Sequence, residues 1–276
     1  NPGLDIPAYN GGLFAADPGL DRLEVPGEVF GALTRLGDYD YRPAGSAGAT
    51  GARPVVDVEI LGHIFEQSIT DLEEIEQELA AGLFAPRNVS RRRLQGAFYT
   101  PRAVTRYLVG EALSPLLEER FAALRERHLA AAPAVARPAL GEPRAYDLAA
   151  LGEKAREALV LFWEGWLAEL ETVRILDPAC GSGAFLIEAF DQLYAAYQEA
   201  TERLADLRGQ RSLFDPDATI LGKNLFGVDI NEEAVQICRL SIWIKTAQRG
   251  RQLTALDRTI CRPRGCCRDR SCDPAR

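Results

Sequence analysis

The apolar positions between residues 173 and 197 change their period once, at a pair of glycines. Val173, Ile175 and Leu176 form a short, mostly β-branched run, which is typical of a buried parallel strand. Beyond Gly183, apolar residues recur every three or four positions, as on one face of a helix: Phe185, Leu186, Ala189, Phe190, Leu193, Tyr194 and Tyr197. The pattern therefore predicts a strand, a glycine turn and a helix, which form the ligand-binding corner of a doubly wound α/β sheet.

Two long helices are predicted ahead of this corner. The first covers about residues 103–130, and five apolar residues are available for one packed face: Val104, Leu108, Ala112, Leu116 and Leu117. After an Ala/Pro-rich break over residues 131–143, the second helix covers about residues 149–171. Its tryptophans, Trp163 and Trp166, are expected to pack in the core rather than to stack on bases.

A second strand and helix are predicted after the corner. Residues 202–223 are charged and irregular in pattern, so we interpret them as an insert. The apolar positions of residues 225–230 then predict a short buried strand that ends in an acid, Asp229. Asn231 is placed to cap the next helix, in which two glutamates occupy the favourable first turn. Apolar residues lie on several faces of this helix, which we therefore expect to be buried on much of its surface.

The composition is that of a globular protein with enough residues for a large core. The sequence has 276 residues, of which 47% are apolar and 26% charged. It has no apolar run of membrane-spanning length and no signal peptide, so we predict no membrane partner and expect a cytoplasmic location.

Because the sequence begins at Asn1 and contains no methionine, we expect it to be an internal piece of a longer protein. Its net charge of −8 is unfavourable for an isolated DNA-binding module, so most phosphate contacts to any DNA are expected elsewhere.

Residues 1–90 differ in character from the rest of the sequence. The segment 42–54 is rich in Gly, Ala, Ser and Pro, which indicates a flexible loop, and residues 72–79 indicate an acidic amphipathic helix. His63 has apolar neighbours, so we interpret it as a buried, hydrogen-bonded residue rather than a metal ligand or base. The basic run at residues 91–93 is interpreted as a solvated helix end rather than a phosphate contact.

The glycine turn departs from the dinucleotide-binding fingerprint. Gly181 and Gly183 permit a tight turn and close approach of the backbone to a ligand, but the third glycine of G-x-G-x-x-G is missing. Asp177 stands just before the turn, where its carboxylate would repel a pyrophosphate and favour a cationic amine. S-adenosylmethionine carries an amine and a sulfonium and has no phosphate, so we favour it as the cofactor. A βα turn without a ligand and a nicotinamide-binding turn are the alternatives.

Two further stretches carry polar groups suited to such a cofactor. Thr100 can cap a helix that Pro101 starts, and the free N–H groups of that first turn suit a carboxylate, although an ordinary helix cap explains the pattern equally well. Asp229 follows the second predicted strand, where a carboxylate can accept both ribose hydroxyls. Ile230 would then lie against the adenine ring.

Three stretches, in this chain order, resemble the adenine-N6 DNA methyltransferases of the γ arrangement: Gly96–Val104, Asp177–Leu186 and Asn224–Ile244. The similarity is greatest to those within combined restriction-and-modification polypeptides of the type IIG kind. The resemblance implies an α/β fold, namely a partial Rossmann-like (class I) S-adenosylmethionine-dependent methyltransferase sheet preceded by a mostly helical region. It also implies a set of cofactor-binding residues: Tyr99, Thr100, Pro101, Asp177, Pro178, Ala179, Cys180, Gly181, Gly183, Asp229 and Ile230.

The implied activity is transfer of a methyl group from S-adenosylmethionine to N6 of a flipped adenine in double-stranded DNA. A restriction–modification polypeptide would also hold a nuclease and a target-recognition region. Two alternatives are a non-catalytic S-adenosylmethionine-binding fragment and a methyltransferase for RNA, protein or a small molecule. A nicotinamide oxidoreductase is a further alternative, disfavoured by Asp177 and the missing glycine.

The resemblance breaks near residue 260. The family continues with an Asn/Asp-Pro-Pro-Tyr/Phe loop that accepts the protons of the adenine amine, but this sequence contains no Pro-Pro pair. The catalytic residues are therefore unknown, and we expect the chain alone to be inactive. Residues 261–276 hold four cysteines and five arginines, which we interpret as a tail produced by a shifted reading frame. A zinc knuckle is the alternative, but the C-x4-C-C-x4-C spacing lacks a C-x2-C hook, so no metal is predicted.

The predicted divisions follow from these patterns. The resemblance implies that residues 1–90 form a helical connector region and that residues 91–260 form the N-terminal, cofactor-binding half of a methyltransferase domain, and residues 261–276 form the aberrant tail.

Overall fold

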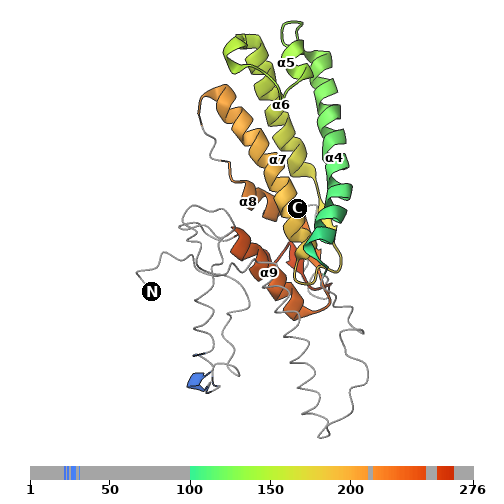
Figure 1. Cartoon of the computed structure of the whole chain (residues 1–276), viewed down its shortest axis with the longest axis vertical. Coiled ribbons are helices and arrows are strands. Elements are labelled where there is room, and N and C mark those ends of the chain that lie inside the picture. Colours follow the sequence, from blue (N-terminus) through green and yellow to red (C-terminus); the bar gives the residue numbers. More distant parts are fainter. Residues whose placement is uncertain are drawn as a thin grey trace. The chain divides into compact units, whose positions relative to one another are not determined.

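The computed structural model describes residues 22, 24, 26–28, 31, 100–210, 214–246 and 254–263 (Figure 1). The chain divides into two compact units. The first comprises Asn1–Thr100, Ala179–Ala184 and Val228–Arg276, and the second comprises Pro101–Pro178 and Phe185–Gly227. The segments 42–54 and 72–79, the basic run at 91–93, His63, Tyr99 and the tail beyond residue 263 lie outside the described residues. No helix of the described residues is long and apolar enough to cross a membrane.

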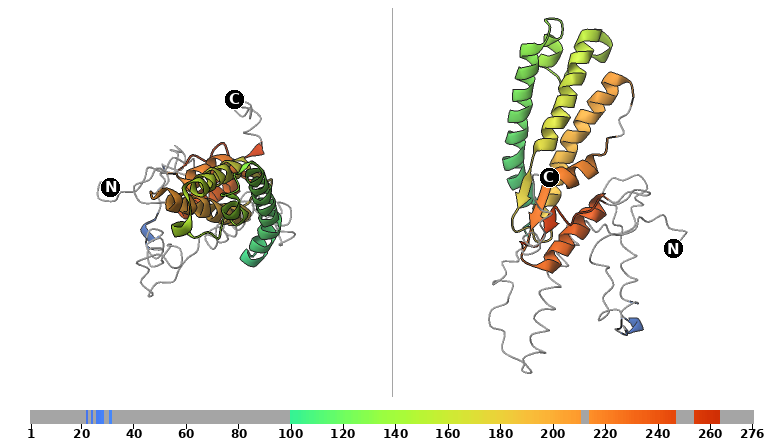
Figure 2. Two further views of the ribbon diagram at one scale, coloured as in Figure 1. Left: turned by 90° about the horizontal axis from the view of Figure 1, so that it is seen from above. Right: turned by 180° about the vertical axis from the view of Figure 1, so that it is seen from behind.

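Long helices dominate the second unit. Figures 1 and 2 show three of them, α4, α6 and α7, running alongside one another. In chain order, the helices and strands that begin in this unit, or run into it, are α4 (Arg102–Ala131), α5 (Arg137–Gly141), a 3₁₀ turn (Leu148–Ala150), α6 (Glu153–Thr172), β1 (Ile175–Asp177), α7 (Ala184–Arg208), α8 (Pro216–Thr219), a π-helical turn (Ile220–Asn224) and β2 (Leu225–Val228). The first unit contributes α9 (Glu232–Thr246) and β3 (Ile260–Cys261).

An aromatic cluster joins α4 to α6. The ring of Phe121 meets those of Phe162 and Trp166 edge to face, with centroids 5.2 and 5.0 Å apart, a geometry that aromatic pairs prefer. Trp163 and Trp166 are both buried, which confirms that they pack in the core. The guanidinium of Arg144 covers the ring of Phe121 at 4.1 Å and closes the cluster on one side.

This cluster selects a face of α4 that differs from the predicted one. The face of α4 that was predicted to pack is largely exposed to solvent: the exposed fraction is 44% for Val104 and 48% for Leu108. The buried residues of α4 are Thr105, Leu113, Phe121 and Leu124. The helix carries apolar residues on two faces, and the face that holds Phe121 packs because it can bury an aromatic ring against α6. The helix bounds are close to the prediction, but its packed face was predicted wrongly.

The start of α4 also differs from the prediction. Pro101 is the cap residue, with extended backbone angles, and no side chain of the described residues forms a capping hydrogen bond. The carbonyl of Pro101 accepts hydrogen bonds from the N–H groups of Val104 and Thr105. Thr100 therefore does not cap the helix, and Pro101 precedes the first helical residue instead of occupying it, because its ψ of 142° lies outside the helical region.

The strands form a small sheet in which β2 is central. Within the second unit, β1 and β2 are parallel and in register, with Ile175 opposite Leu225 and Asp177 opposite Gly227. Within the first unit, the N–H of Asp229 donates to the carbonyl of Cys261 in β3 at 3.3 Å. The prediction of a buried first strand is wrong: Leu176 is 61% exposed and Ile175 is half-buried, because β1 lies at an edge of the described sheet. Val173 is buried, but it follows α6 and precedes β1.

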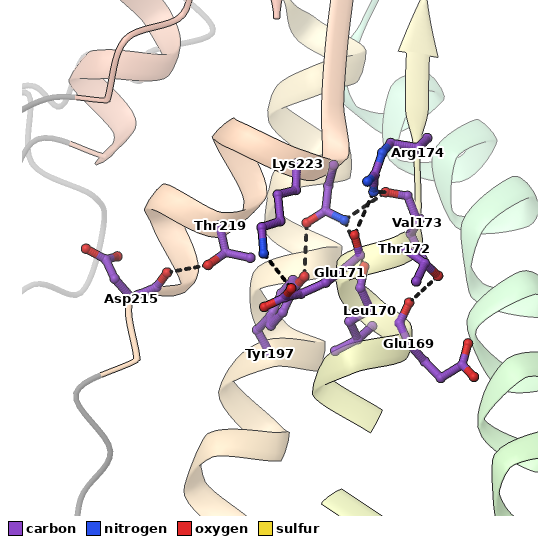
Figure 3. Close-up of polar contacts among 11 residues, drawn as sticks. Glu169, Leu170, Glu171, Thr172, Val173, Arg174, Tyr197, Asp215, Thr219 and Lys223 are labelled. Atoms are coloured by element: carbon purple, nitrogen blue, oxygen red, sulfur yellow. Dashed lines mark hydrogen bonds and ion pairs between the residues drawn. The ribbon is translucent and has the colours of Figure 1, made fainter. Parts of the chain in front are cut away.

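Part of the predicted irregular insert is helical. α7 continues to Arg208, and the π-helical turn leads directly into β2. A buried network fixes this junction: the side-chain amide of Asn224 donates to the carbonyls of Leu170 and Val173, both at 2.8 Å, and accepts from the hydroxyl of Tyr197 at 3.1 Å. Figure 3 shows these bonds, together with the Lys223–Glu171 ion pair beside them. The start of β2 is thereby tied to the end of α6.

Candidate functional site

The glycine turn adopts backbone angles that favour glycine. Gly181 has φ 51° and Gly183 has φ 94°, both in the left-handed region. Packing also restricts Gly183, because a Cβ there would lie 2.7 Å from the Sγ of Cys238 on α9. The sequence indicated a close approach of a ligand at these glycines; the structure adds a close approach of α9.

Backbone N–H groups of the turn are bonded within the first unit. Cys180 N–H donates to the carbonyl of Val228 at 3.0 Å, and Gly183 N–H donates to the carbonyl of Cys180 at 2.8 Å. Gly181 N–H donates to Oδ2 of Asp229 at 2.9 Å. The turn is therefore fastened to the end of β2 at two successive residues.

Asp229 is the polar centre of this arrangement. Its Oδ2 accepts from Gly181, and its Oδ1 accepts from the N–H of Asn231 at 2.9 Å. Asn231 in turn caps α9, as predicted, by accepting from the N–H of Ala234 at 2.9 Å. A carboxylate has about four lone-pair positions, so the half-buried Asp229 keeps acceptor capacity for further donors.

Each of the two predicted acids stands at the carboxyl end of a parallel strand. Asp177 is the last residue of β1 and is paired in register with Gly227, and Asp229 comes two residues after Gly227 in the chain.

The other predicted site residues differ in exposure. Cys180 is buried, whereas Pro178, Ala179 and Pro101 are exposed. Ile230 is 67% exposed, as a residue must be to meet a ligand, and Thr100 is half-buried. The positions of these residues are compatible with the predicted roles, which remain predictions.

An apolar groove of about 450 Å³ lies in the second unit and was missed by the sequence reasoning. Its walls are α4, β1 and the first turns of α7, with Asp177 and Pro178 at the β1 wall. Leu108, Ala112 and Leu116 belong to the predicted packing stripe of α4, and they line this groove instead of meeting α6.

A buried carboxylate on α7 was also missed. Glu188 is 4% exposed, and its Oε1 accepts from the side-chain amide of Gln192 at 3.3 Å and lies 3.7 Å from Nε of Arg106. Its Oε2 and the Oε1 of Gln192 are buried and have no hydrogen-bond partner among the described residues. A glutamate in an apolar helical repeat gives no sequence signal for burial, since charged residues are usually on the solvent face.

The segment after α9 is held by two side chains of that helix. The buried guanidinium of Arg239 donates from Nε and Nη2 to the carbonyl of Ile260, at 2.9 and 2.6 Å, and forms an ion pair with Asp257 at 3.0 Å. The indole N–H of Trp243 donates to the carbonyl of Thr254 at 2.7 Å. These bonds fix β3, whose Cys261 accepts from Asp229.

Comparison with known proteins agrees with this geometry. Residues 153–261 match the family model described as the MmeI DNA-methyltransferase domain. A putative type II restriction enzyme and methyltransferase of Methanocaldococcus jannaschii is 30% identical over 252 residues, which cover 87% of this chain and 18% of that protein. The adenine-specific methyltransferase BrxX of Escherichia coli is 38% identical over 85 residues, or 31% of this chain and 6% of BrxX. DNA methyltransferase A of Bacillus subtilis is 32% identical over 90 residues, or 33% of this chain and 10% of that protein.

The structure combines helices with a small parallel sheet, and a glycine turn connects its first strand to a long helix. This arrangement is consistent with a methyltransferase-like α/β fold. Residues 153–261 are therefore similar to the MmeI DNA-methyltransferase domain, and the chain is similar to proteins named as a restriction enzyme and methyltransferase and as adenine-specific methyltransferases. The chain spans less than a fifth of the length of the curated relatives it matches. The family match ends at Cys261, where the composition of the sequence changes.

Proposed function

We propose that this chain is the cofactor-binding half of an adenine-specific DNA methyltransferase in a restriction–modification system. The cofactor is S-adenosylmethionine, bound at a Rossmann-like corner, and the substrate is double-stranded DNA. When bound, S-adenosylmethionine supplies an electrophilic methyl group for N6 of a flipped adenine. A nuclease and a target-recognition region belong to the same polypeptide in this proposal.

The observation that carries the proposal is the internal bonding of the glycine turn. Phosphate-binding glycine turns offer free N–H groups to an anion. Here the N–H groups of Cys180, Gly181 and Gly183 are already donated to protein oxygens. The same turn has the carboxylate of Asp229 beside it, which suits a ligand with hydroxyl or ammonium donors. S-adenosylmethionine has those donors, whereas a dinucleotide requires a pyrophosphate site.

The proposed roles follow from this chemistry. Asp177, with Pro178, Ala179 and the turn from Cys180 to Gly183, holds the ammonium end of the cofactor. Asp229 accepts the two ribose hydroxyls through its remaining lone pairs, and Ile230 covers the adenine ring. Tyr99, Thr100 and Pro101 border the methionine tail. No Pro-Pro pair occurs in the sequence, so the groups that accept the protons of the adenine amine are supplied by another part of the polypeptide.

Calorimetric titration of the chain with S-adenosylmethionine and with NAD tests the proposal. We expect S-adenosylmethionine to bind and NAD not to bind. Asp229→Ala should weaken S-adenosylmethionine binding at least ten-fold, because hydrogen bonds to a charged group contribute about 1.5–3 kcal/mol. A chain that binds NAD in preference to S-adenosylmethionine would contradict the proposal. We also expect no methylation of plasmid DNA by the purified chain alone.

A further inference from the structure

We infer that Asp229 is a positioning residue for the glycine turn, in addition to the ribose contact proposed above. The inference rests on the proposed function for the identity of the ligand. Its structural basis is independent of the ligand, since the bonds in question join residues of the first unit only.

The two carboxylate oxygens of Asp229 hold two different segments. Oδ2 accepts from Gly181 N–H of the turn, and Oδ1 accepts from Asn231 N–H at the start of α9, both at 2.9 Å. The left-handed φ of 51° at Gly181 is a conformation that an unfastened glycine would leave readily, because glycine samples both signs of φ. The bond to Asp229 therefore selects one shape of the turn before any ligand arrives.

A ligand that binds a turn already in its final shape does not lose affinity to the ordering of that turn. Asp229 should consequently affect cofactor affinity in two separable ways. One depends on the ribose hydroxyls, and the other persists when the ligand has no hydroxyls. An aspartate that only contacted the ribose would show the first effect without the second.

The variant Asp229→Asn separates these effects. Its side chain has one carbonyl oxygen, so it can accept from only one of the two N–H groups, and its NH₂ group faces the other. The ligands are S-adenosylhomocysteine and its 2′,3′-dideoxy analogue, each titrated into the wild-type chain and the variant. Glu233→Gln is the matched control, because Glu233 is an exposed carboxylate in the first turn of α9.

We expect the dideoxy analogue to bind Asp229→Asn roughly ten-fold more weakly than it binds the wild-type chain. We expect Glu233→Gln to bind both ligands as the wild type does. Equal binding of the dideoxy analogue to the wild type and Asp229→Asn would overturn the positioning role and leave the proposed function intact. If the wild type binds neither ligand, the proposed function fails, and with it the role in cofactor binding.

Native-state hydrogen exchange of the ligand-free wild type tests the turn without any ligand or variant. We expect the amide of Gly181 to be protected, because it is bonded to Asp229. In Asp229→Asn, the amide of Gly181 or that of Asn231 should lose its protection. A Gly181 amide that exchanges at the rate of an unstructured peptide in the wild type would overturn the inference even if S-adenosylhomocysteine binds.

Discussion

The Sγ of Cys238 lies 2.7 Å from the position that a Cβ on Gly183 would occupy. Residue 183 is thus restricted twice, by its φ of 94° and by the helix packed against it. The two restrictions can be separated, because Gly209 has a left-handed φ of 69° and no atom of the described residues lies within 4 Å of its Cβ position. Replacing each glycine by alanine therefore compares strain alone with strain plus a steric clash.

We expect Gly183→Ala to lower the free energy of unfolding by about 2–3 kcal/mol and Gly209→Ala by about 1 kcal/mol. Adding Cys238→Ala to Gly183→Ala removes the Sγ, and the next contacts, at 3.5 and 3.6 Å, are ordinary ones. The double variant should recover about 1 kcal/mol of the loss. Urea unfolding of the four proteins measures these differences. Equal losses for Gly183→Ala and Gly209→Ala would show that the contact with Cys238 is unimportant.

Asn224 should be among the residues least tolerant of substitution in the second unit. Asn224→Ala leaves the carbonyls of Leu170 and Val173 and the hydroxyl of Tyr197 without their bonds, in a buried position. We expect a loss of about 3 kcal/mol or more, whereas Tyr197→Phe, which removes one bond, should cost about 1 kcal/mol. Thr219→Ala is the control, since within the described part of the chain the Thr219 hydroxyl donates to the carbonyl of Asp215, four residues earlier. A loss for Asn224→Ala no larger than that of the control, in urea unfolding, would contradict this prediction.

The sequence predicted the elements around the glycine turn better than it predicted which faces pack. The apolar repeat after Gly183 corresponds to α7, and five of its seven predicted residues are buried: Leu186, Ala189, Phe190, Leu193 and Tyr197. The extensive burial of α9 and the cap at Asn231 are confirmed. On α4, by contrast, two apolar faces compete, and the choice depends on aromatic partners in α6 about 40 residues later in the chain. Periodicity within one helix cannot encode that choice.

Some residues of the candidate site could be predicted from the sequence, and others could not. Three site residues can be found in the sequence because each comes soon after a predicted strand and has a residue type that is uncommon within strands: Gly181, Gly183 and Asp229. Cys238 and Glu188 do not, because a cysteine and a glutamate within helical repeats have no distinguishing local pattern. Their roles arise from contacts across the fold, with Gly183 in one case and with Arg106 in the other. Thr100 shows the opposite error, since a sequence well suited to capping forms no side-chain cap.

Glu188→Gln should stabilise the protein. In the wild type, Oε2 of Glu188 and Oε1 of Gln192 are two buried acceptors that receive no donor from the part of the chain that the structure describes. A glutamine at position 188 replaces one acceptor with an NH₂ group that can donate to Gln192, one turn farther along α7. The substitution also removes the ion pair between Glu188 and Arg106. This pair contributes little to stability, because its atoms are 3.7 Å apart and the side chain of Arg106 is 67% exposed.

We expect Glu188→Gln to raise the free energy of unfolding by about 1 kcal/mol. Gln192→Glu is the reciprocal variant, and it should destabilise the protein because it adds a second carboxylate beside the first. Urea unfolding at neutral pH measures both. Destabilisation by Glu188→Gln would indicate that Oε2 has a donor in solution, such as an ordered water molecule.

His128 should make stability depend on pH in the mildly acidic range. Partial burial lowers the pKa of His128 below its usual 6.5, and the positive charge of Arg127 lowers it further. The folded protein therefore binds the proton less readily than the unfolded chain does. The resulting stabilisation is fully present above pH 6.5 and is lost as the pH falls through the lowered pKa of the folded state. His128→Phe retains an aromatic ring against Phe162 and removes the titrating group.

The difference in unfolding free energy between the wild type and His128→Phe should therefore change between pH 7.5 and pH 5, to the disadvantage of the wild type at low pH. A difference that is constant over this range, measured by urea unfolding at each pH, would show that the pKa of His128 is the same in the folded and unfolded states. Carboxylates that titrate in the same range are common to both proteins, so their contribution cancels in the comparison.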